Sequence, residues 1–175
     1  MKILVISDTH GRASRILDVL DTHPTYDALL FLGDGLRDLE WASDNIHGLF
    51  SVRGNCDGLS FFDLSGDAPK DELFIRFDEY NILMTHGHRF GVKGGVGTAV
   101  AYAASKGADI LIYGHTHIPE ERYIPEGEAV GNTVLKKPLR IFNPGSLGSP
   151  REGYPSYGII DIRGSSVLMS VGYLK

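Results

Sequence analysis

The chain has 175 residues, which fits one domain of ordinary size. Apolar residues make up 42% and charged residues 22%, a balance that excludes an intrinsically disordered chain. The net charge of −5 argues against a surface that binds nucleic-acid backbone, and a single cysteine excludes an intrachain disulfide framework and suits a reducing compartment. Apolar runs such as residues 28–32 are far shorter than the ~20 residues of a membrane helix. We therefore expect one cytoplasmic domain over residues 1–175, with no membrane segment.

Short apolar runs and amphipathic segments alternate over the first two-thirds of the chain. Apolar runs rich in aliphatic residues predict buried strands at residues 3–6, 29–32, 49–52 and 110–113. Helical spacing of apolar residues predicts a helix around residues 13–20, a short one over 36–42, and a third over 94–106 with Gly107 as its C-cap.

The second half of the chain contains more strand patterns. Alternation over residues 73–77 and an apolar run at 82–84 indicate antiparallel strands. Residues 140–142, 157–162 and 167–173 are strand-like, with a hairpin turn at 164–166. Early βαβ units followed by a β-rich tail favour a mixed α/β fold.

Polar residues follow the predicted buried strands at the point where each strand ends. These tips are Asp8-Thr9-His10, Gly33-Asp34, Gly54-Asn55-Cys56-Asp57, His86-Gly87-His88 and His115-Thr116-His117. The carboxyl ends of strands are where α/β sheets place their sites, because rigid strands fix the loops that follow them. Five of the seven histidines lie in three of these tips, a concentration that surface solvation alone does not predict.

The residue types at the tips are metal ligands of mixed character. Seven candidates offer oxygen or imidazole nitrogen: Asp8, His10, Asp34, Asn55, His86, His115 and His117. This set suits Mn²⁺, Fe, Co²⁺, Ni²⁺ or Zn²⁺ better than Ca²⁺ or a structural cysteine-type zinc. Seven ligands are too many for one tetrahedral ion and suit two ions that share a carboxylate. Such a site is cationic, attracts phosphate and activates water at neutral pH.

Each motif taken singly is more often structural than functional. An Asp-x-His pair is common at strand ends, and a His-x-His pair can lie on a solvated edge. Five tips in order with matching chemistry favour a metal site. His23 and His47 lie outside these motifs and are interpreted as structural or surface histidines.

The ordered set of tips resembles the calcineurin-like metallophosphoesterase superfamily. The Gly54-Asn55-Cys56-Asp57 form and the Asn143-Pro144-Gly145-Ser146 stretch are similar to its YfcE/MJ0936-like phosphodiesterase branch. The resemblance runs from about Lys2 to the C-terminus. It implies a four-layer αββα sandwich of two mixed β-sheets flanked by helices.

The resemblance also implies how the ligands divide between two divalent ions, with Mn²⁺ as the first choice. One ion would be held by Asp8, His10, Asp34 and His117, and the other by Asp34, Asn55, His86 and His115, so that Asp34 bridges. Asp34 and Asn55 would be catalytic, the latter both binding an ion and orienting phosphate. His88 and Arg12 are candidate substrate contacts; support of a ligand or exposure to solvent is the alternative for His88, and a surface charge is the alternative for Arg12.

Cys56 departs from the family pattern, because many members carry a histidine directly after the asparagine. A thiol with its usual pKa near 8.5 is a poor general acid, so the departure favours substrates with good leaving groups. Cys56 remains a candidate substrate contact. One alternative is that Cys56 acts as a covalent nucleophile. We expect instead that it packs beneath the metal site.

The expected function is hydrolysis of a small phosphoester, most of all a phosphodiester, by in-line attack of a hydroxide that bridges the ions. One alternative is a fold-retaining scaffold that binds a protein partner, as the related retromer subunit does. Another is a phosphomonoesterase or phosphoprotein phosphatase, although this short chain has little room for long recognition loops. A homo-oligomer is left open.

Overall fold

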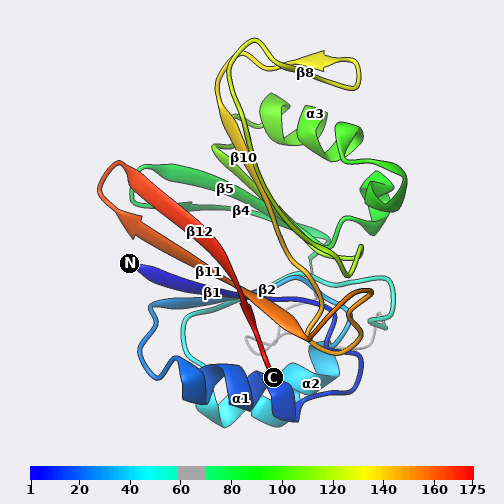
Figure 1. Ribbon diagram of the computed structural model, residues 1–175, viewed down its shortest axis with the longest axis vertical. Coiled ribbons are helices and arrows are strands. Elements are labelled where there is room, and N and C mark those ends of the chain that lie inside the picture. Colours follow the sequence, from blue (N-terminus) through cyan, green and yellow to red (C-terminus); the bar gives the residue numbers. More distant parts are fainter. Residues whose placement is uncertain (59–69) are drawn as a thin grey trace.

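Two β-sheets packed face to face form the centre of the computed structural model, which describes residues 1–58 and 70–175. Figure 1 shows helices α1 (Ser14–Thr22) and α2 (Leu36–Ala42) below the first sheet and α3 (Gly97–Ser105) above the second. The order of layers is therefore helix, sheet, sheet, helix, and the αββα sandwich predicted above is confirmed.

The first sheet has the strand order β12-β11-β1-β2-β3. The pairs β1–β2 and β2–β3 are parallel, and β11 pairs antiparallel with both β1 and β12. The bounds are β1 (Lys2–Ile6), β2 (Ala28–Phe31), β3 (Leu49–Ser51), β11 (Ser156–Arg163) and β12 (Ser166–Tyr173).

The second sheet has the order β4-β5-β6-β10-β7. Strands β5, β6 and β10 run parallel, and the edge strands β4 and β7 pair antiparallel with β5 and β10. The bounds are β4 (Glu72–Phe77), β5 (Tyr80–Thr85), β6 (Ile110–Tyr113), β7 (Pro119–Ile124) and β10 (Leu139–Pro144). A small hairpin, β8 (Ala129–Val130) and β9 (Thr133–Val134), lies near α3.

Alternating side chains of the central strands fill three apolar layers. In β1, Ile3 and Val5 face the second sheet, whereas Leu4 and Ile6 pack against α1 and α2. In β6, Leu111 and Tyr113 pack instead against α3. Because both faces of these strands are covered, they carry continuous apolar runs, as parallel strands inside α/β proteins do. The three clusters fix the strand ends from which the polar loops emerge.

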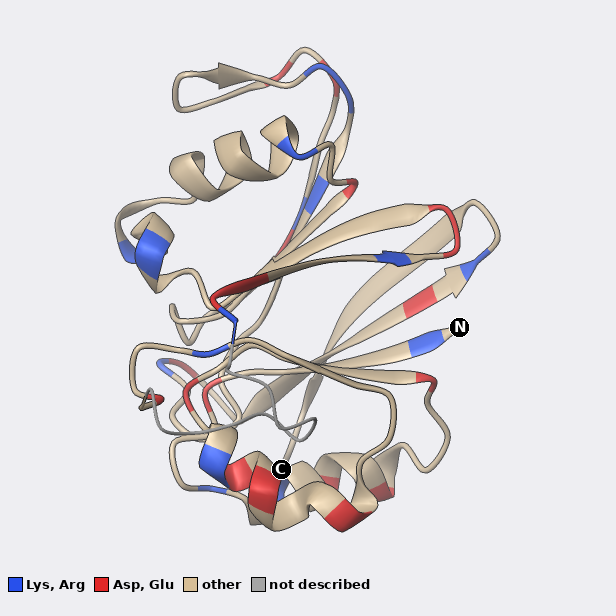
Figure 2. Ribbon diagram, turned by 180° about the vertical axis from the view of Figure 1, so that it is seen from behind, with Lys and Arg blue, Asp and Glu red and all other residues tan. Residues whose placement is uncertain are grey.

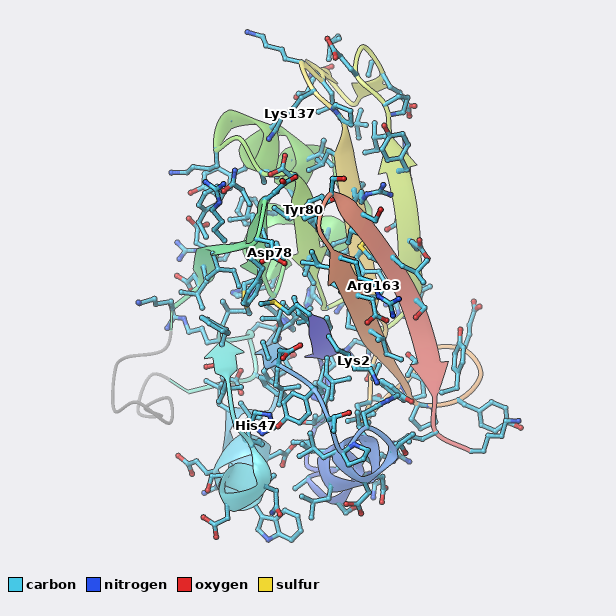
Figure 3. The ribbon with its side chains drawn as sticks, turned by 90° about the vertical axis from the view of Figure 1, so that its left-hand side faces the viewer. Lys2, His47, Asp78, Tyr80, Lys137 and Arg163 are labelled. Atoms are coloured by element: carbon cyan, nitrogen blue, oxygen red, sulfur yellow. The ribbon has the colours of Figure 1, made fainter. Side chains whose placement is uncertain are left out.

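The turns of two hairpins meet across the sandwich. Tyr80 begins β5, and its hydroxyl donates to the carbonyl oxygen of Ser165 in the β11–β12 turn at 2.6 Å. Figure 3 shows Asp78 and Tyr80 near the same end of the molecule as Arg163, the last residue of β11. The hairpin turn predicted at residues 164–166 is confirmed, with β12 already beginning at Ser166.

The third helix is shorter than the sequence predicts. Residues 92–94 form a separate 3₁₀ helix, as do residues 43–45 and 88–90. Gly95 then has a φ of +138°, a conformation that interrupts any helix and favours glycine, so α3 begins only at Gly97. The helix ends as expected, with Gly107 at a φ of +71° just beyond its C-cap. None of the helices in the described part of the chain has the length and apolar character of a transmembrane span.

Candidate metal centre

The predicted ligands lie on loops with unusual backbone geometry. Among the described residues, six other than glycine have a positive φ, and five of them are predicted ligands: Asp8, His10, Asp34, His115 and His117. Left-handed conformations cost energy in residues other than glycine and concentrate at functional sites. The backbone N–H of Asp8 donates to Gly33 at 3.0 Å and that of His10 donates to Asp34 at 3.1 Å, so the loops after β1 and β2 are tied together.

One cluster joins the loop after β1 to the loop after β6. Nε2 of His117 lies 3.1 Å from Oδ1 of Asp8 and 3.3 Å from Nε2 of His10. Nε2 of His10 lies 3.7 Å from Oδ1 of Asp8 and 3.9 Å from Oδ2 of Asp34. The four side chains that the first ion was predicted to use therefore converge.

A second cluster forms around the buried ring of His86. Its Nε2 lies 3.4 Å from Oδ2 of Asp34, 3.2 Å from Oδ1 of Asn55 and 3.1 Å from Nδ1 of His115. These are the four side chains predicted for the second ion. Oδ2 of Asp34 is the atom that faces both clusters, as a bridging ligand requires.

The hydrogen bonds on the far side of two rings decide which atoms face the site. Nδ1 of His86 lies 2.7 Å from the carbonyl oxygen of Leu32, and Nδ1 of His117 lies 2.6 Å from that of Ser149. A carbonyl only accepts, so each Nδ1 carries a proton, and each Nε2 is the ring atom directed into the site, able to bind a metal ion once it is unprotonated.

The Nε2 atoms face carboxylate oxygens, that of His117 toward Asp8 and that of His86 toward Asp34. The side-chain oxygen Oδ1 of Asp8 is fully buried and has no hydrogen-bond partner, although Nε2 of His117 is close. Buried acceptors that face one another without a proton between them repel, unless a cation lies among them. The donor set of carboxylate, amide oxygen and imidazole fits a divalent first-row metal ion.

The charge states of the ligands also suit a cation. Burial opposes ionisation of Asp8 and Asp34, but nearby imidazoles outweigh it and hold both pKa values low, that of Asp34 at about 2. Burial, with His86 and Lys93 nearby, lowers the pKa of His115 to about 4. At neutral pH the site thus offers two carboxylates and, at His115, a neutral imidazole.

Asp57 anchors the loops that carry Asp34 and Asn55, a role that the sequence analysis did not assign. Its carboxylate accepts hydrogen bonds from the backbone N–H groups of Asp34, Gly35, Leu36 and Gly54 at 2.8–3.0 Å. Backbone donors arranged around one carboxylate fix the path of both loops.

Replacing Asp57 with alanine should leave these four donors without their acceptor. We expect the free energy of unfolding to fall by about 1–3 kcal/mol. Mn²⁺ affinity should fall ~10–100-fold, because residues that orient ligands have effects of this size. Calorimetry of melting and of Mn²⁺ binding measures both. Asp57→Asn keeps one acceptor oxygen and should be intermediate; an Asp57→Ala protein with unchanged melting and affinity would contradict the anchoring role.

The stretch from Asn143 to Ser149 lies directly behind the first cluster. The Ser146 hydroxyl donates to the backbone oxygen of Asp8 at 2.8 Å, and the Gly148 N–H donates to the same oxygen at 2.9 Å. Asn143 donates to the backbone oxygen of Gly114 at 3.1 Å, ahead of His115. The sequence analysis named Asn143-Pro144-Gly145-Ser146 only as part of the family resemblance, and these contacts place it beside the site.

The three candidate substrate contacts lie in different settings. His88 is beside the second cluster, with its ring centroid 5.4 Å from that of His86 and 6.2 Å from that of His115. Arg12 is exposed in the turn after His10. Cys56 is also exposed, so the expectation that it packs beneath the metal site is wrong. In this turn the carboxylate of Asp57, and not the thiol of Cys56, points inward.

The thiol of Cys56 does not have the properties of a nucleophile. Partial desolvation of this largely exposed thiol, and then Asp34 beside it, raises the pKa of Cys56 to about 11. A thiolate is the reactive form, and Asp34 disfavours it. The histidines interpreted as structural have ordinary partners: His23 lies 3.0 Å from the Tyr157 hydroxyl, and His47 (labelled in Figure 3) stacks on Tyr26.

Comparison with known proteins connects this geometry to a family. The sequence model of the calcineurin-like phosphoesterase superfamily domain matches residues 1–165. The probable metallophosphoesterase YsnB of Bacillus subtilis is 33% identical over 164 residues, which cover 93% of this chain and 85% of that protein. Phosphodiesterase YfcE of Escherichia coli is 31% identical in an alignment of 186 positions, and the alignment covers 92% of this chain and 88% of that protein.

Solved structures show the same fold. The YfcE structure from E. coli superposes with a TM-score of 0.61 and 26% identity, covering 92% of this chain and 88% of that one. Vacuolar Protein Sorting 29 from Cryptosporidium parvum superposes with a TM-score of 0.75 and 19% identity, covering 99% of this chain and 91% of that one. The second likeness concerns the fold alone.

Proposed function

The chain belongs to the calcineurin-like phosphoesterase superfamily, and from that premise we propose that it hydrolyses phosphodiesters at a dinuclear metal centre. The observation that carries the proposal is the pair of ligand clusters on either side of Asp34. Each cluster brings carboxylate oxygens and imidazole nitrogens together, and the buried Oδ1 of Asp8 has no hydrogen-bond partner.

The ligands divide as the two clusters do. Asp8, His10, Asp34 and His117 hold one ion, and Asp34, Asn55, His86 and His115 hold the other. When bound, two such ions supply Lewis acidity toward phosphate oxygens and an activated water at neutral pH. Mn²⁺ is the proposed metal, because a set rich in carboxylate and imidazole accepts it and offers no thiolate among these seven ligands.

Asp34 and Asn55 are the residues of this chain that we assign to catalysis. Asp34 stays ionised because of its low pKa and supplies the negative charge common to both clusters. Asn55 is exposed at the mouth of the site, with its Oδ1 directed to His86 and its amide nitrogen able to turn toward a phosphate oxygen. His88, next to the second cluster, is the proposed substrate contact from the other side. Arg12 and Cys56 lie at the same rim as weaker candidates.

Charge outside the centre agrees with a small anionic substrate rather than nucleic-acid backbone. Figure 2 shows acidic residues on both α1 and α2, and the chain carries a net charge of −5. A cationic centre in an acidic protein attracts a phosphoester locally without a basic surface around it. We propose a single domain over residues 1–175 in the cytoplasm, where one thiol stays reduced.

A phosphoester panel tests the function. Metal-stripped protein given back Mn²⁺ should hydrolyse diesters, and p-nitrophenyl esters should react far faster than alkyl esters, because Cys56 does not replace the histidine that would protonate a leaving group. His86→Ala, which removes the central ring of one cluster, should be inactive on the same panel. Wild-type protein that holds metal and hydrolyses no member of the panel would contradict the proposal. A flat dependence on leaving-group pKa would show that another acid is present.

The same panel separates the alternatives. Hydrolysis of phosphomonoesters or phosphopeptides in preference to diesters would indicate a phosphatase. A scaffold would hydrolyse none of them. The fold shared with Vacuolar Protein Sorting 29, at 19% identity, does not favour the scaffold, since all seven ligand positions are occupied by ligand residues in this chain.

A further inference from the structure

Cys56 belongs to a third set of side chains with the geometry of a metal site. The thiol sulfur, a nitrogen of His10 and a carboxylate oxygen of Asp34 all lie within 4.8 Å of one another. His10 and Asp34 are also the proposed ligands of the first ion. The thiol therefore lies at the open side of an ion that the rest of the centre already holds.

The contacts around Cys56 keep the thiol in this position. Its backbone N–H donates to Oδ1 of Asp34 at 2.7 Å, and the amide nitrogen of Asn55 lies 3.2 Å from the sulfur. The unpartnered Oδ1 of Asp8, fully buried, lies 3.7 Å from Nε2 of His10 in a second group, made of Asp8, His10 and His117, so the two groups meet at His10. A cation there would be approached by carboxylate, imidazole and sulfur together.

Bond lengths allow the sulfur of Cys56 to coordinate the same ion as His10 and Asp34. Zinc binds thiolate at about 2.3 Å and imidazole at about 2.0–2.1 Å, so at a tetrahedral angle these two ligand atoms are about 3.6 Å apart. The ligand atoms of the cluster lie within 4.8 Å of one another, so the sulfur would move inward by at most about 1.2 Å to reach this separation. Because Cys56 is exposed, rotation of its side chain meets little resistance.

We propose that Cys56 makes the first metal position selective: a thiophilic ion such as Zn²⁺ takes its sulfur as an additional ligand, whereas Mn²⁺ leaves the thiol free. Soft thiolate ligands favour zinc, and manganese favours carboxylate and water. On binding, the S–H bond breaks, the sulfur keeps the electron pair that forms the bond to the ion, and the proton goes to solvent.

The consequence is that the two metals leave different open positions at the same centre. Zinc bound through Cys56 would fill the place that water or a phosphate oxygen otherwise takes, and such closed sites are structural rather than catalytic. The inference rests on the proposed metal centre, but its tests do not use hydrolysis, so an inactive protein leaves them informative.

The single cysteine of the chain makes a direct test possible, because any thiol signal reports Cys56. With metal-stripped protein, Zn²⁺ should slow alkylation by iodoacetamide roughly ten-fold or more, since a coordinated thiolate is not free to react, and Mn²⁺ should have little effect. Cobalt-substituted protein should show a thiolate-to-cobalt charge-transfer band in the near ultraviolet. Cys56→Ser should abolish the band and weaken zinc about ten-fold or more, with manganese affinity unchanged.

Two histidine variants form a matched pair. His10→Ala removes a member of the Cys56 cluster and should lose both zinc protection and the cobalt band. His115→Ala removes a ligand of the other ion and should keep both. Equal protection by Mn²⁺ and Zn²⁺ with no charge-transfer band would overturn the proposal, because it would mean that ions only obstruct access to the thiol.

Discussion

Asp34→Asn should remove metal from both positions together, with hydrolysis falling by at least ~10²-fold. The carboxylate oxygen Oδ2 of Asp34 lies 3.9 Å from Nε2 of His10 and 3.4 Å from Nε2 of His86, so it faces both clusters. An amide in its place removes the charge that the two ions would share. Elemental analysis after reconstitution with Mn²⁺ and a p-nitrophenyl diester assay measure both effects.

The fold should survive this change, because the apolar layers do not depend on Asp34. Asp44→Asn, on the exposed 3₁₀ helix after α2, is a matched control that removes one acidic charge elsewhere and should bind metal as the wild type does. An Asp34→Asn protein that lost only one ion would show that the carboxylate serves a single position and would contradict a bridging role.

Gly33→Ala should be strongly destabilising and should disturb the site. A Cβ at Gly33 would lie 2.3 Å from the backbone nitrogen of Gly54, which neither loop can accommodate without separating. Gly33 also has a φ of +95°, which itself disfavours alanine. The collision should cost about 1–3 kcal/mol beyond the backbone cost, and it should pull the Asp34 loop away from the Asn55 loop.

Gly107→Ala separates the free-energy cost of the collision from that of the backbone conformation. Gly107 has a φ of +71°, but a Cβ added there would meet nothing within 4 Å, so alanine at this position carries only the cost of its backbone conformation. Thermal melting should place Gly33→Ala at least ~2 °C below Gly107→Ala, and only Gly33→Ala should lose Mn²⁺ affinity. Equal melting temperatures would mean that the loops after β2 and β3 separate without cost.

The order of layers and the ligand tips could be predicted because they rest on strong local patterns. Continuous apolar runs mark β1, β2 and β6, and strand polarity then brings their carboxyl ends to one edge. The predicted bounds of α2 and β6 match the structure. For the other long apolar elements, the differences are confined to the ends.

Elements with weaker patterns were missed for physical reasons. Strand β7 has the sequence Pro-Glu-Glu-Arg-Tyr-Ile and pairs only with β10, so as a half-solvated edge strand it carries little apolar signal. The β8–β9 hairpin has two residues in each strand, too few for periodicity.

The orientation of tip residues could not be read from the sequence. Cys56 and Asp57 are neighbours, and nothing in their order says which one turns inward. Four backbone N–H groups brought together from two loops draw the Asp57 carboxylate in and leave Cys56 outside. That arrangement arises from tertiary contacts, as does the support of Asp8 by Ser146 from the far end of the chain.

The number of ions per chain tests the central claim most directly. Metal-stripped wild-type protein should be reconstituted with Mn²⁺, freed of excess ion and measured by elemental analysis, with protein concentration determined independently. Two ligand clusters that share Asp34 predict two ions per chain, and His86→Ala, which damages only one cluster, should retain about one. A wild-type protein that binds a single ion, or none, would contradict the dinuclear centre.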